Sequence, residues 1–516
     1  MARIQLCEAL QRVVGLLSNR GRRLDLNESQ NRALNLMRRA VEGSVEVPLG
    51  AIQGPPGTGK TSVVEAFAER VLSRFLDDIA SKEIVIYVAP TNHLAVEAFT
   101  RISYALLAKG LFSVRDILDM TRVYGYKISP GDCKGLERLH GITEDMVRQV
   151  LQGYIEPGTV KLVFTTEFQR VSGRFRDKPD RVHLIVDEAS KSPYFRAFLP
   201  MADYIMRYEG YPGSLVALGD PEQAIAVPEE FRRDVPLLMN KVIKLLDKGG
   251  LKDSNYVFLD TTYRLPNPSE EPISKGFYDG KLRAFYTSSY KLREMRYVFE
   301  DERRKVLGEL NKLKSLDKET QLVHEALYNA VTSSSPIVIL DTGKFTPISR
   351  RAVISTYDAV RARVSAKASL ILQLYGVRGG FDVMAISPYS DMASNIQYLL
   401  ASKYGSLIKT PPLSLTVHSV IGGEADAIVA VLGKEYPSSR GFNLFLDDGA
   451  YQTIYFNEPQ VLNVQLSRHR RLMVVVGHLD GLTEPRRPRQ WKKLSTTAEA
   501  MNKLIDQGLA VRVRIG

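Results

Sequence analysis

Short apolar segments recur through the first half of the chain, and each ends in glycine or in polar residues. They lie within 49–52, 84–89, 161–166, 182–186 and 214–218. Between several of them, apolar residues recur every three or four positions, which is the helical period. Buried strands that alternate with helices are typical of a parallel sheet covered on both faces. The first half therefore predicts an α/β domain.

The same alternation resumes in the second half, after a highly charged stretch. The predicted strands there are 336–340, 383–386, 413–417, 427–431 and 472–476. Helical stretches lie between them, so we expect a second α/β sheet with its own core.

Domain boundaries follow from where these patterns stop. We predict a first domain over 1–235, a linker over 236–256 and a second domain over 257–516. Residues 103–158 have mixed patterns and are interpreted as an insertion in the first domain. The charged block 286–335 has apolar residues at helical spacing and predicts a helical insertion in the second.

A glycine-rich segment follows the first predicted strand and precedes a helical pattern. It matches the spacing G-x-x-x-x-G-K-[ST], and this strand–loop–helix context is the one in which such a segment binds phosphate. Its glycines let backbone N–H groups turn toward an anion, and the helix adds its positive dipole end. We expect these residues to bind a nucleoside triphosphate, with Lys60 on the β/γ-phosphates and Thr61 on Mg²⁺: Gly54, Pro55, Pro56, Gly57, Thr58, Gly59, Lys60, Thr61 and Ser62.

Two adjacent acids, Asp187 and Glu188, end the strand 182–186. Carboxyl ends of parallel strands are where such sheets place their chemistry. With a phosphate loop upstream, we expect Asp187 to hold Mg²⁺ and Glu188 to deprotonate the attacking water. Without that loop the pair would often be a helix N-cap. Gln223 follows the next strand and could sense the γ-phosphate, with Asp220 linking it to the acids.

Three further residues are candidates on position alone. Gln30 lies upstream of the phosphate loop, where it is either a surface helix residue or a reader of the adenine edge. Arg264 could stabilise charge on a transferring phosphoryl group, and Tyr263 could stack on a base.

The amino-acid composition indicates what kind of partner the protein binds and in which cellular compartment we expect it. Lys and Arg outnumber Asp and Glu by 70 to 58, and the pI is about 9.4, which suits a polyanionic partner. The only cysteines, Cys7 and Cys133, cannot build a zinc ribbon, and so few cysteines favour a reducing compartment. No apolar run approaches the roughly 20 residues that span a bilayer. We expect a soluble, cytoplasmic protein without membrane contact.

Taken in order, these segments resemble the motifs of superfamily 1 (group B) helicases, specifically the Upf-like branch. The resemblance runs from about Leu26 to Gly477. Besides the phosphate loop, the segments that carry it are Leu26–Gln30, Ala89–Val96, Phe164–Thr166, Asp187–Ser190, Gly219–Gln223, Tyr263–Pro266, Val417–Asp426 and Leu462–Arg470.

The resemblance implies two tandem RecA-like P-loop domains that use ATP and Mg²⁺, in a protein we expect to be monomeric. By it, Gln30 reads adenine, Tyr263 stacks on it and Glu424 approaches the ribose. Arg264 and Arg468 would act as fingers on the γ-phosphate. It also implies 5′ to 3′ movement on single-stranded DNA or RNA, contacted mostly through its backbone. The residues implied to line that path are Pro90, Thr91, Asn92, Thr165, Thr166, Ser387, Thr416 and His418.

Two positions depart from the family pattern. Ile421 and Met392 stand where the family usually has Gln, and both changes remove polar contacts near the expected strand path. A nucleic-acid-stimulated ATPase that remodels or clamps nucleoprotein without unwinding is the alternative function. A P-loop kinase or signalling protein would leave the second sheet and its arginines unexplained.

Overall fold

The chain divides into two compact units. A computed structural model describes residues 25–42, 49–78, 81–108, 110, 112–125, 143–210, 212–223, 236–312, 316–346, 357–404, 413–420, 423–434, 458–483 and 492–515. The first unit comprises residues up to 55 and 59–259, and the second comprises 56–58 and 260–516. Each unit is built on its own parallel sheet.

The sheet of the first unit has seven strands in the order β3-β4-β2-β5-β6-β1-β7, all parallel. Successive side chains of a strand point to opposite faces. In β2, Val85 and Tyr87 therefore enter one core while Ile84 and Ile86 enter the other. Both faces are buried, which explains the unbroken apolar segments. The strands are β1 (Leu49–Gln53), β2 (Ile84–Ala89), β3 (Thr121–Val123), β4 (Leu162–Thr166), β5 (Val182–Val186), β6 (Ser214–Gly219) and β7 (Tyr256–Phe258).

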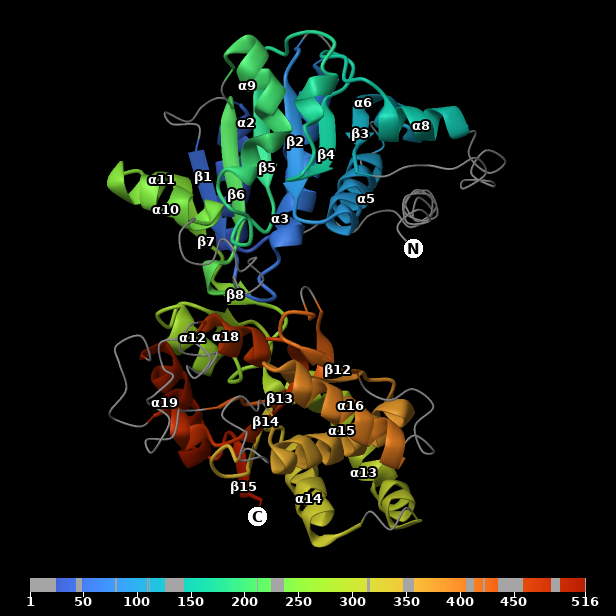
Figure 1. Ribbon diagram of the computed structural model, residues 1–516, viewed down its shortest axis with the longest axis vertical. Helices are drawn as coiled ribbons and strands as arrows, with labels where there is room; N and C mark the ends of the chain where they lie inside the picture. The colour runs from blue at the N-terminus through green and yellow to red at the C-terminus, as the bar shows by residue number, and fades with distance from the viewer. Residues whose placement is uncertain are drawn as a thin grey trace. The chain divides into compact units, whose positions relative to one another are not determined.

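Helices cover both faces of this sheet, as Figure 1 shows. One face carries α2 (Glu28–Val41), α3 (Lys60–Phe67), α5 (Asn92–Ala108), α6 (Val114–Met120) and α8 (Glu144–Gln152), with α3 continuing through the π-helical turn η2 (Ala68–Leu72) into α4 (Ser73–Asp77). The other carries η3 (Val171–Arg174), η4 (Arg196–Met201), α9 (Ala202–Tyr208) and α10 (Leu238–Lys248). The short elements η5 (Pro221–Gln223) and α11 (Lys252–Asn255) complete the unit.

The second unit has a six-stranded parallel sheet in the order β12-β11-β13-β14-β10-β15. Its strands are β10 (Ile337–Asp341), β11 (Val383–Ser387), β12 (Leu413–Thr416), β13 (Ala425–Val431), β14 (His469–Gly477) and β15 (Val511–Arg514). A two-stranded sheet of β8 (Thr261–Thr262) and β9 (Arg283–Ala284) lies apart from it. The predicted fold class, two α/β domains with parallel sheets flanked by helices, is confirmed.

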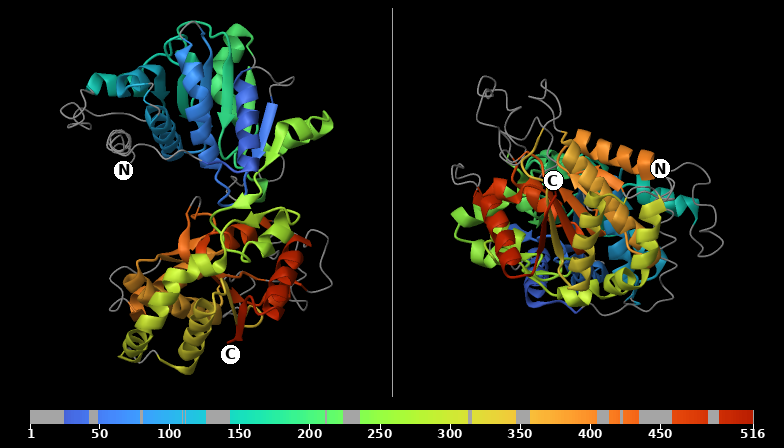
Figure 2. Two further views of the ribbon diagram at one scale, coloured as in Figure 1. Left: turned by 180° about the vertical axis from the view of Figure 1, so that it is seen from behind. Right: turned by 90° about the horizontal axis from the view of Figure 1, so that it is seen from below.

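Four long helices share one core with the second sheet, and Figure 2 shows them from two further sides. They are α13 (Ser288–Lys312), α14 (Lys318–Thr332), α15 (Ala359–Gly379) and α16 (Ser390–Tyr404). Elsewhere α12 (Glu271–Phe277) packs against α18 (Gln460–Leu466) and α19 (Lys492–Asp506), and η8 (Leu479–Leu482) against α19. None of the helices in the described ranges is both long and apolar enough to cross a membrane.

Three segments differ from the sequence predictions. The predicted linker 236–256 forms α10, α11 and the first residue of β7, because its apolar residues cover the first sheet. The predicted insertion 103–158 contributes β3, an edge strand of the main sheet. The predicted insertion 286–335 holds α13 and α14, which bury side chains such as Phe299 in the second core. Packing against a sheet, rather than projection from it, decides all three.

Candidate nucleotide-binding site

The phosphate loop joins β1 to α3 in the way its sequence predicts. Gly57 and Gly59 have φ values of 69° and 78°, which non-glycine residues rarely adopt. Gly59 is also the N-cap of α3 and offers no side-chain cap. The Lys60 ammonium donates to the carbonyl oxygen of Gly54 at 2.6 Å, so it folds back over the loop.

Gln30 lies beside this loop. Asn27 and Gln30 form a capping box at the start of α2, in which the Asn27 N–H donates to Oε1 of Gln30 at 3.0 Å. A Cβ added at Gly59 would lie only 2.5 Å from Nε2 of Gln30. The capping box therefore fixes the Gln30 amide against the loop, and Gly59 must be glycine for that approach.

The acid pair occupies the end of β5. The Tyr87 hydroxyl donates to Oδ2 of Asp187 at 2.8 Å, and the Glu188 N–H donates to Oδ1 at 2.8 Å. Glu188 has a φ of 50°, an uncommon backbone conformation that is found most often at functional sites. Its carboxylate pairs with Lys191 at 2.7 Å.

Burial and charge tune these groups. Burial, with the negative charge of Glu188, raises the pKa of Asp187, although the Lys60 ammonium opposes the shift. Burial and Asp187 likewise raise the pKa of Tyr87, so that its hydroxyl stays a donor. A divalent cation would relieve the crowded negative charge at Asp187. The Asp187 carboxylate and the hydroxyl of the exposed Thr61 are oxygen ligands of the kind that Mg²⁺ prefers, so the chemistry of these two residues fits that ion.

A hydrogen-bonded chain positions Gln223 after β6. Its Nε2 donates to Oδ2 of Asp220 at 2.7 Å, and Gln53 at the end of β1 donates to Oδ1 of Asp220 at 3.1 Å. The Tyr256 hydroxyl in turn donates to Gln53 at 2.8 Å. The Asp220 N–H donates to the Ser190 hydroxyl at 3.2 Å, which connects this chain to the segment that carries the acids.

The second unit pairs two predicted site residues with each other. A guanidinium nitrogen of Arg264 lies 2.7 Å from a carboxylate oxygen of Glu424, and the other terminal nitrogen donates to the carbonyl oxygen of Ser467 at 3.3 Å. Arg470 approaches the other Glu424 oxygen at 3.4 Å. Burial lowers the pKa of Arg264 while Glu424 opposes the shift. The ion pair with Glu424 and the hydrogen bond to Ser467 thus place Arg264 next to the segment that contains Arg468.

Aromatic side chains surround Tyr263. Its ring centroid lies 5.0 Å from that of Phe285 and 6.5 Å from that of Tyr286, and its carbonyl oxygen accepts from Lys291 at 3.0 Å. After Arg468, the buried His469 ring contacts the Ser269 hydroxyl at 2.7 Å. Burial lowers the pKa of His469 to about 3, so this ring is neutral.

The residues predicted to line the strand path differ in accessibility. Those that are exposed or half-buried are Pro90, Thr91, Asn92, Thr416 and His418, and those that are buried are Thr165, Thr166 and Ser387. The Thr165 hydroxyl faces the carbonyl oxygen of Thr166 at 3.4 Å, and Ser387 accepts from the Tyr389 N–H at 3.1 Å. The hydroxyls of Thr165 and Ser387 thus contact local backbone groups, and the strand contacts predicted for all three residues stay predictions.

Of the two positions that depart from the family pattern, Met392 and Ile421, the structure describes only Met392. Met392 is fully buried in the core of the second unit, where an amide would lack the apolar contacts of the thioether. Its replacement of Gln thus trades a polar contact for core packing. Ile421 lies outside the described residues, as do Cys7 and Cys133.

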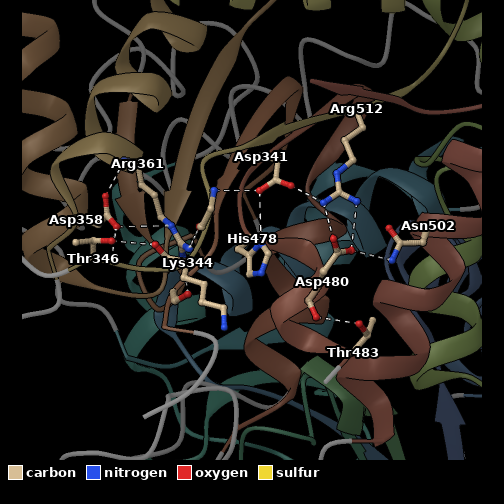
Figure 3. Close-up of polar contacts among 12 residues, drawn as sticks. Asp341, Lys344, Thr346, Asp358, Arg361, His478, Asp480, Thr483, Asn502 and Arg512 are labelled. Carbon is tan, nitrogen blue, oxygen red and sulfur yellow. Dashed lines mark hydrogen bonds and ion pairs between the residues drawn. The ribbon is translucent and has the colours of Figure 1, made fainter. Parts of the chain in front are cut away.

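A second polar cluster lies at the carboxyl ends of β10 and β14 (Figure 3). Arg512 of β15 donates to Oδ2 of Asp480 at 2.6 Å and to Asp341 at the end of β10. Asn502 donates to Asp480 at 3.1 Å, and Nδ1 of His478 lies 3.5 Å from Asp341. Because these contacts join β15 and α19 to the sheet, we interpret the cluster as structural.

Sequence reasoning missed the groups that support the predicted residues. Tyr87 was counted only as an apolar strand residue, although a hydroxyl in a buried strand requires a partner. Asp382, which lies 2.7 Å from Arg470, carries no motif signal at all. Asp426 was quoted within a motif, but its contact with Arg470 at 3.2 Å depends on the pairing of β13 with β14.

Comparisons with known proteins agree with this arrangement. Two family models, each described as an AAA domain, match residues 25–129 and 238–480. The chain is 24% identical over 479 residues to the putative ATP-dependent RNA helicase ECM32 of Saccharomyces cerevisiae, covering 85% of this chain and 39% of the relative. It is 22% identical over 504 residues to the DNA polymerase alpha-associated DNA helicase A of that yeast, covering 89% and 65%. The chain spans less than two thirds of either relative.

Among solved structures, S. cerevisiae Dbp5 bound to RNA and ADP BeF3 aligns with a TM-score of 0.42 and 11% identity, over 98% of this chain and 93% of that one. The DUF1998 helicase MrfA bound to DNA aligns with a TM-score of 0.40 and 12% identity, over 91% and 51%. Both TM-scores are below 0.5.

A phosphate loop and an acid pair on one parallel sheet, followed by a second α/β unit that carries arginines, define a P-loop nucleotide-binding protein with two sheets. The two AAA-domain matches and the two helicase relatives identify the family within this class of P-loop proteins. The chain belongs to the Upf-like branch of the superfamily 1 helicases.

Proposed function

We propose that this protein is an ATP-dependent translocase and helicase that moves 5′ to 3′ along single-stranded DNA or RNA. The observation that carries the proposal is the placement of three groups on neighbouring strands. The phosphate loop follows β1, the acid pair follows β5 and Gln223 follows β6, and these strands are adjacent in the order β5-β6-β1. Family membership and the named activities of the relatives support it.

The first unit would carry out hydrolysis. Lys60 would neutralise charge on the β/γ-phosphates, and Glu188 would accept a proton from the attacking water. Gln223 would sense the γ-phosphate through its fixed amide, and Gln30 would read adenine. Thr61 and Asp187 would hold Mg²⁺, which supplies further charge stabilisation when it is bound.

The second unit would supply the complementary charge. Arg264 and Arg468 would stabilise the transferring phosphoryl group, Tyr263 would stack on adenine, and Glu424 would approach the ribose. In this structure Arg264 is paired with Glu424, so catalysis would require that Arg264 exchange a carboxylate for a phosphate as its partner. Such an exchange would couple the nucleotide state to the second unit.

The test is the steady-state ATPase rate at fixed salt without nucleic acid, with single-stranded DNA and with single-stranded RNA. Strong stimulation of ATP hydrolysis by one polymer would support the proposed translocase and would identify that polymer as its substrate. A rate that is indifferent to both polymers would overturn the proposal.

Strand displacement separates unwinding from the alternative function. Forked duplexes with a 5′ or a 3′ single-stranded tail should release a strand only from the 5′-tailed substrate. Stimulated hydrolysis without release from either fork would instead indicate an ATPase that remodels or clamps nucleoprotein.

A further inference from the structure

An open cleft of about 540 Å³ lies on the first unit beside β3, the edge strand of its sheet. None of its lining residues belongs to the phosphate loop or to the predicted strand path. The lining comes from β3, from α8 and the loop after it, and from the segment after η3, and its three arginines outnumber its two acids: Arg122, Asp145, Arg148, Gln149, Gln152, Gly153, Tyr154, Glu156 and Arg176.

A buried cation lies at this cleft. Arg122 is only 7% exposed, and its guanidinium donates to the carbonyl oxygens of Tyr154 at 3.1 Å, Thr121 at 2.7 Å, Asp119 at 3.1 Å and Leu118 at 3.4 Å. Within the described residues it forms no ion pair with a carboxylate. Burial lowers the pKa of Arg122, which shows that its charge is poorly solvated. Because these carbonyl oxygens carry only partial negative charge, an anion that entered the cleft would still be attracted to the guanidinium.

A flat aromatic surface stands next to this cation. The Tyr154 side chain is 59% exposed, and the guanidinium of Arg176 lies 4.9 Å from its ring centroid. Backbone hydrogen bonds hold the segments of this pair together. The Ile155 N–H donates to the carbonyl oxygen of Arg174 at 2.9 Å, and the Arg176 N–H donates to the carbonyl oxygen of Ile155 at 3.0 Å. A ring that is supported by a cation and still exposed suits a stacked nucleobase.

Hydrogen bonds connect the elements that line the cleft with elements that carry the predicted strand path. Strands β2 and β4, whose ends carry path residues, are followed in the sheet order by β3. Asn92 after β2 donates to the carbonyl oxygen of Gly125 at 2.9 Å. The Tyr124 hydroxyl donates to the carbonyl oxygen of Gly153, the residue before Tyr154, at 2.7 Å. Contacts therefore lead from the path around the sheet edge to the cleft.

We propose that this cleft binds a further segment of single-stranded nucleic acid, with a phosphate near Arg122 and a base stacked on Tyr154. The inference rests on the proposed function and extends its track beyond the family motifs. An acidic peptide would use the cations but would leave the exposed ring without a role. An open cleft also suits a continuous strand better than a free nucleotide, which is usually enclosed.

The experiment measures binding of labelled single strands of about 8 and about 30 nucleotides by fluorescence anisotropy over a salt series. Tyr154→Ala should weaken binding of the long strand roughly tenfold and leave the short strand unchanged. Tyr154→Phe keeps the ring and should behave like the wild type. Arg148→Gln should lower the slope of log affinity against log salt by about 0.7 for the long strand alone.

Controls separate this site from general surface effects. Tyr398→Ala removes another exposed tyrosine, 68% exposed, from α16 of the second unit and should leave the binding of both strands unchanged. Thermal melting of each variant establishes that it is folded.

Two outcomes would overturn the inference and remain distinguishable. Wild-type affinity and salt slope in both Tyr154→Ala and Arg148→Gln would exclude a strand in the cleft. Wild-type protein that bound no single strand of either length would overturn the proposed function together with this site.

Discussion

The two units place candidate residues of the nucleotide site at opposite ends of similar sheets. In the first, the phosphate loop, Asp187 and Gln223 follow the carboxyl ends of β1, β5 and β6. In the second, Glu424 and Arg468 immediately precede the amino ends of β13 and β14. The rule that parallel sheets act at their carboxyl ends locates the first set and would miss the second.

The units also stabilise their polar groups differently. In the first, burial raises the pKa of Asp187, Tyr87 and Glu167, and neighbouring hydrogen bonds hold these groups. In the second, hydrogen bonds from arginines lower the pKa of Glu319 and Asp480. In these examples, the polar groups of the first unit are buried and held by hydrogen bonds, whereas those of the second unit are held mainly by ion pairs. Four variants test that contrast.

Removing the arginine of the second unit should have the largest effect. Arg264→Ala should lower the rate of ATP hydrolysis about 10³- to 10⁵-fold, because one of the two arginines proposed to stabilise the transferring phosphoryl group would be lost. Single-turnover hydrolysis with saturating nucleic acid measures this. Glu424→Gln breaks the same ion pair but keeps the guanidinium, and its loss should be much smaller. Equal losses in the two variants would show that the pair is structural.

Neutralising the acid of the first unit should come next. Glu188→Gln should lower hydrolysis about 10²- to 10⁴-fold and preserve ATP binding, because the amide cannot accept the proton of the water. Fluorescent-nucleotide binding and single-turnover hydrolysis separate the two steps. Glu97→Gln on α5 is the matched control and should leave both unchanged. Normal turnover in Glu188→Gln would remove Glu188 from the role of general base.

A smaller effect is expected where the first unit orients a predicted metal ligand. Tyr87→Phe removes the hydrogen bond to Asp187, and the Mg²⁺ concentration for half-maximal ATPase should rise about tenfold. Saturating Mg²⁺ should restore most of the rate. Tyr204→Phe removes another buried phenol of the same unit and should not change the Mg²⁺ dependence. An unchanged requirement in Tyr87→Phe would contradict the orienting role.

The smallest effect concerns stability in acid, where the ion pairs of the second unit should fail. Burial alone raises the pKa of Asp317, but hydrogen bonds from Lys367 and the Thr320 N–H outweigh it and lower the pKa to about 2. Because the folded pKa lies below the usual value of about 3.9, this group stabilises the fold above pH 4 and loses that effect as pH falls toward 2.

Asp317→Asn keeps an N-cap for α14 and removes the charge. Since the Asp317 side chain is 57% exposed, the loss should be only a few tenths to about 1 kcal/mol at pH 5. Melting temperatures of wild type and variant should differ at pH 5, differ less at pH 3 and converge as the pH approaches 2. A difference that stayed constant over this range would exclude the ion pair as its cause.

Local patterns sufficed to predict much of the fold. The run Ile84–Ala89 forms β2 over the same residues, and the loop that ends in Lys60 joins a strand to a helix as its spacing requires. By contrast β15 was missed, because Val511–Arg514 alternates apolar and basic residues at the end of the chain. Its pairing with β10 depends on residues about 170 positions away, through contacts such as that of Arg512 with Asp341.

The sequence by itself determined which residues carry the candidate chemistry and the order in which they occur, because phosphate loops and acid pairs are set by short-range backbone geometry. Only the tertiary structure decided what holds them. The contact of Gln30 with the loop, the bond from Tyr87 to Asp187 and the pairing of Arg264 with Glu424 join distant segments. Such contacts arise when sheets assemble and side chains lose water together, which no spacing along one chain encodes.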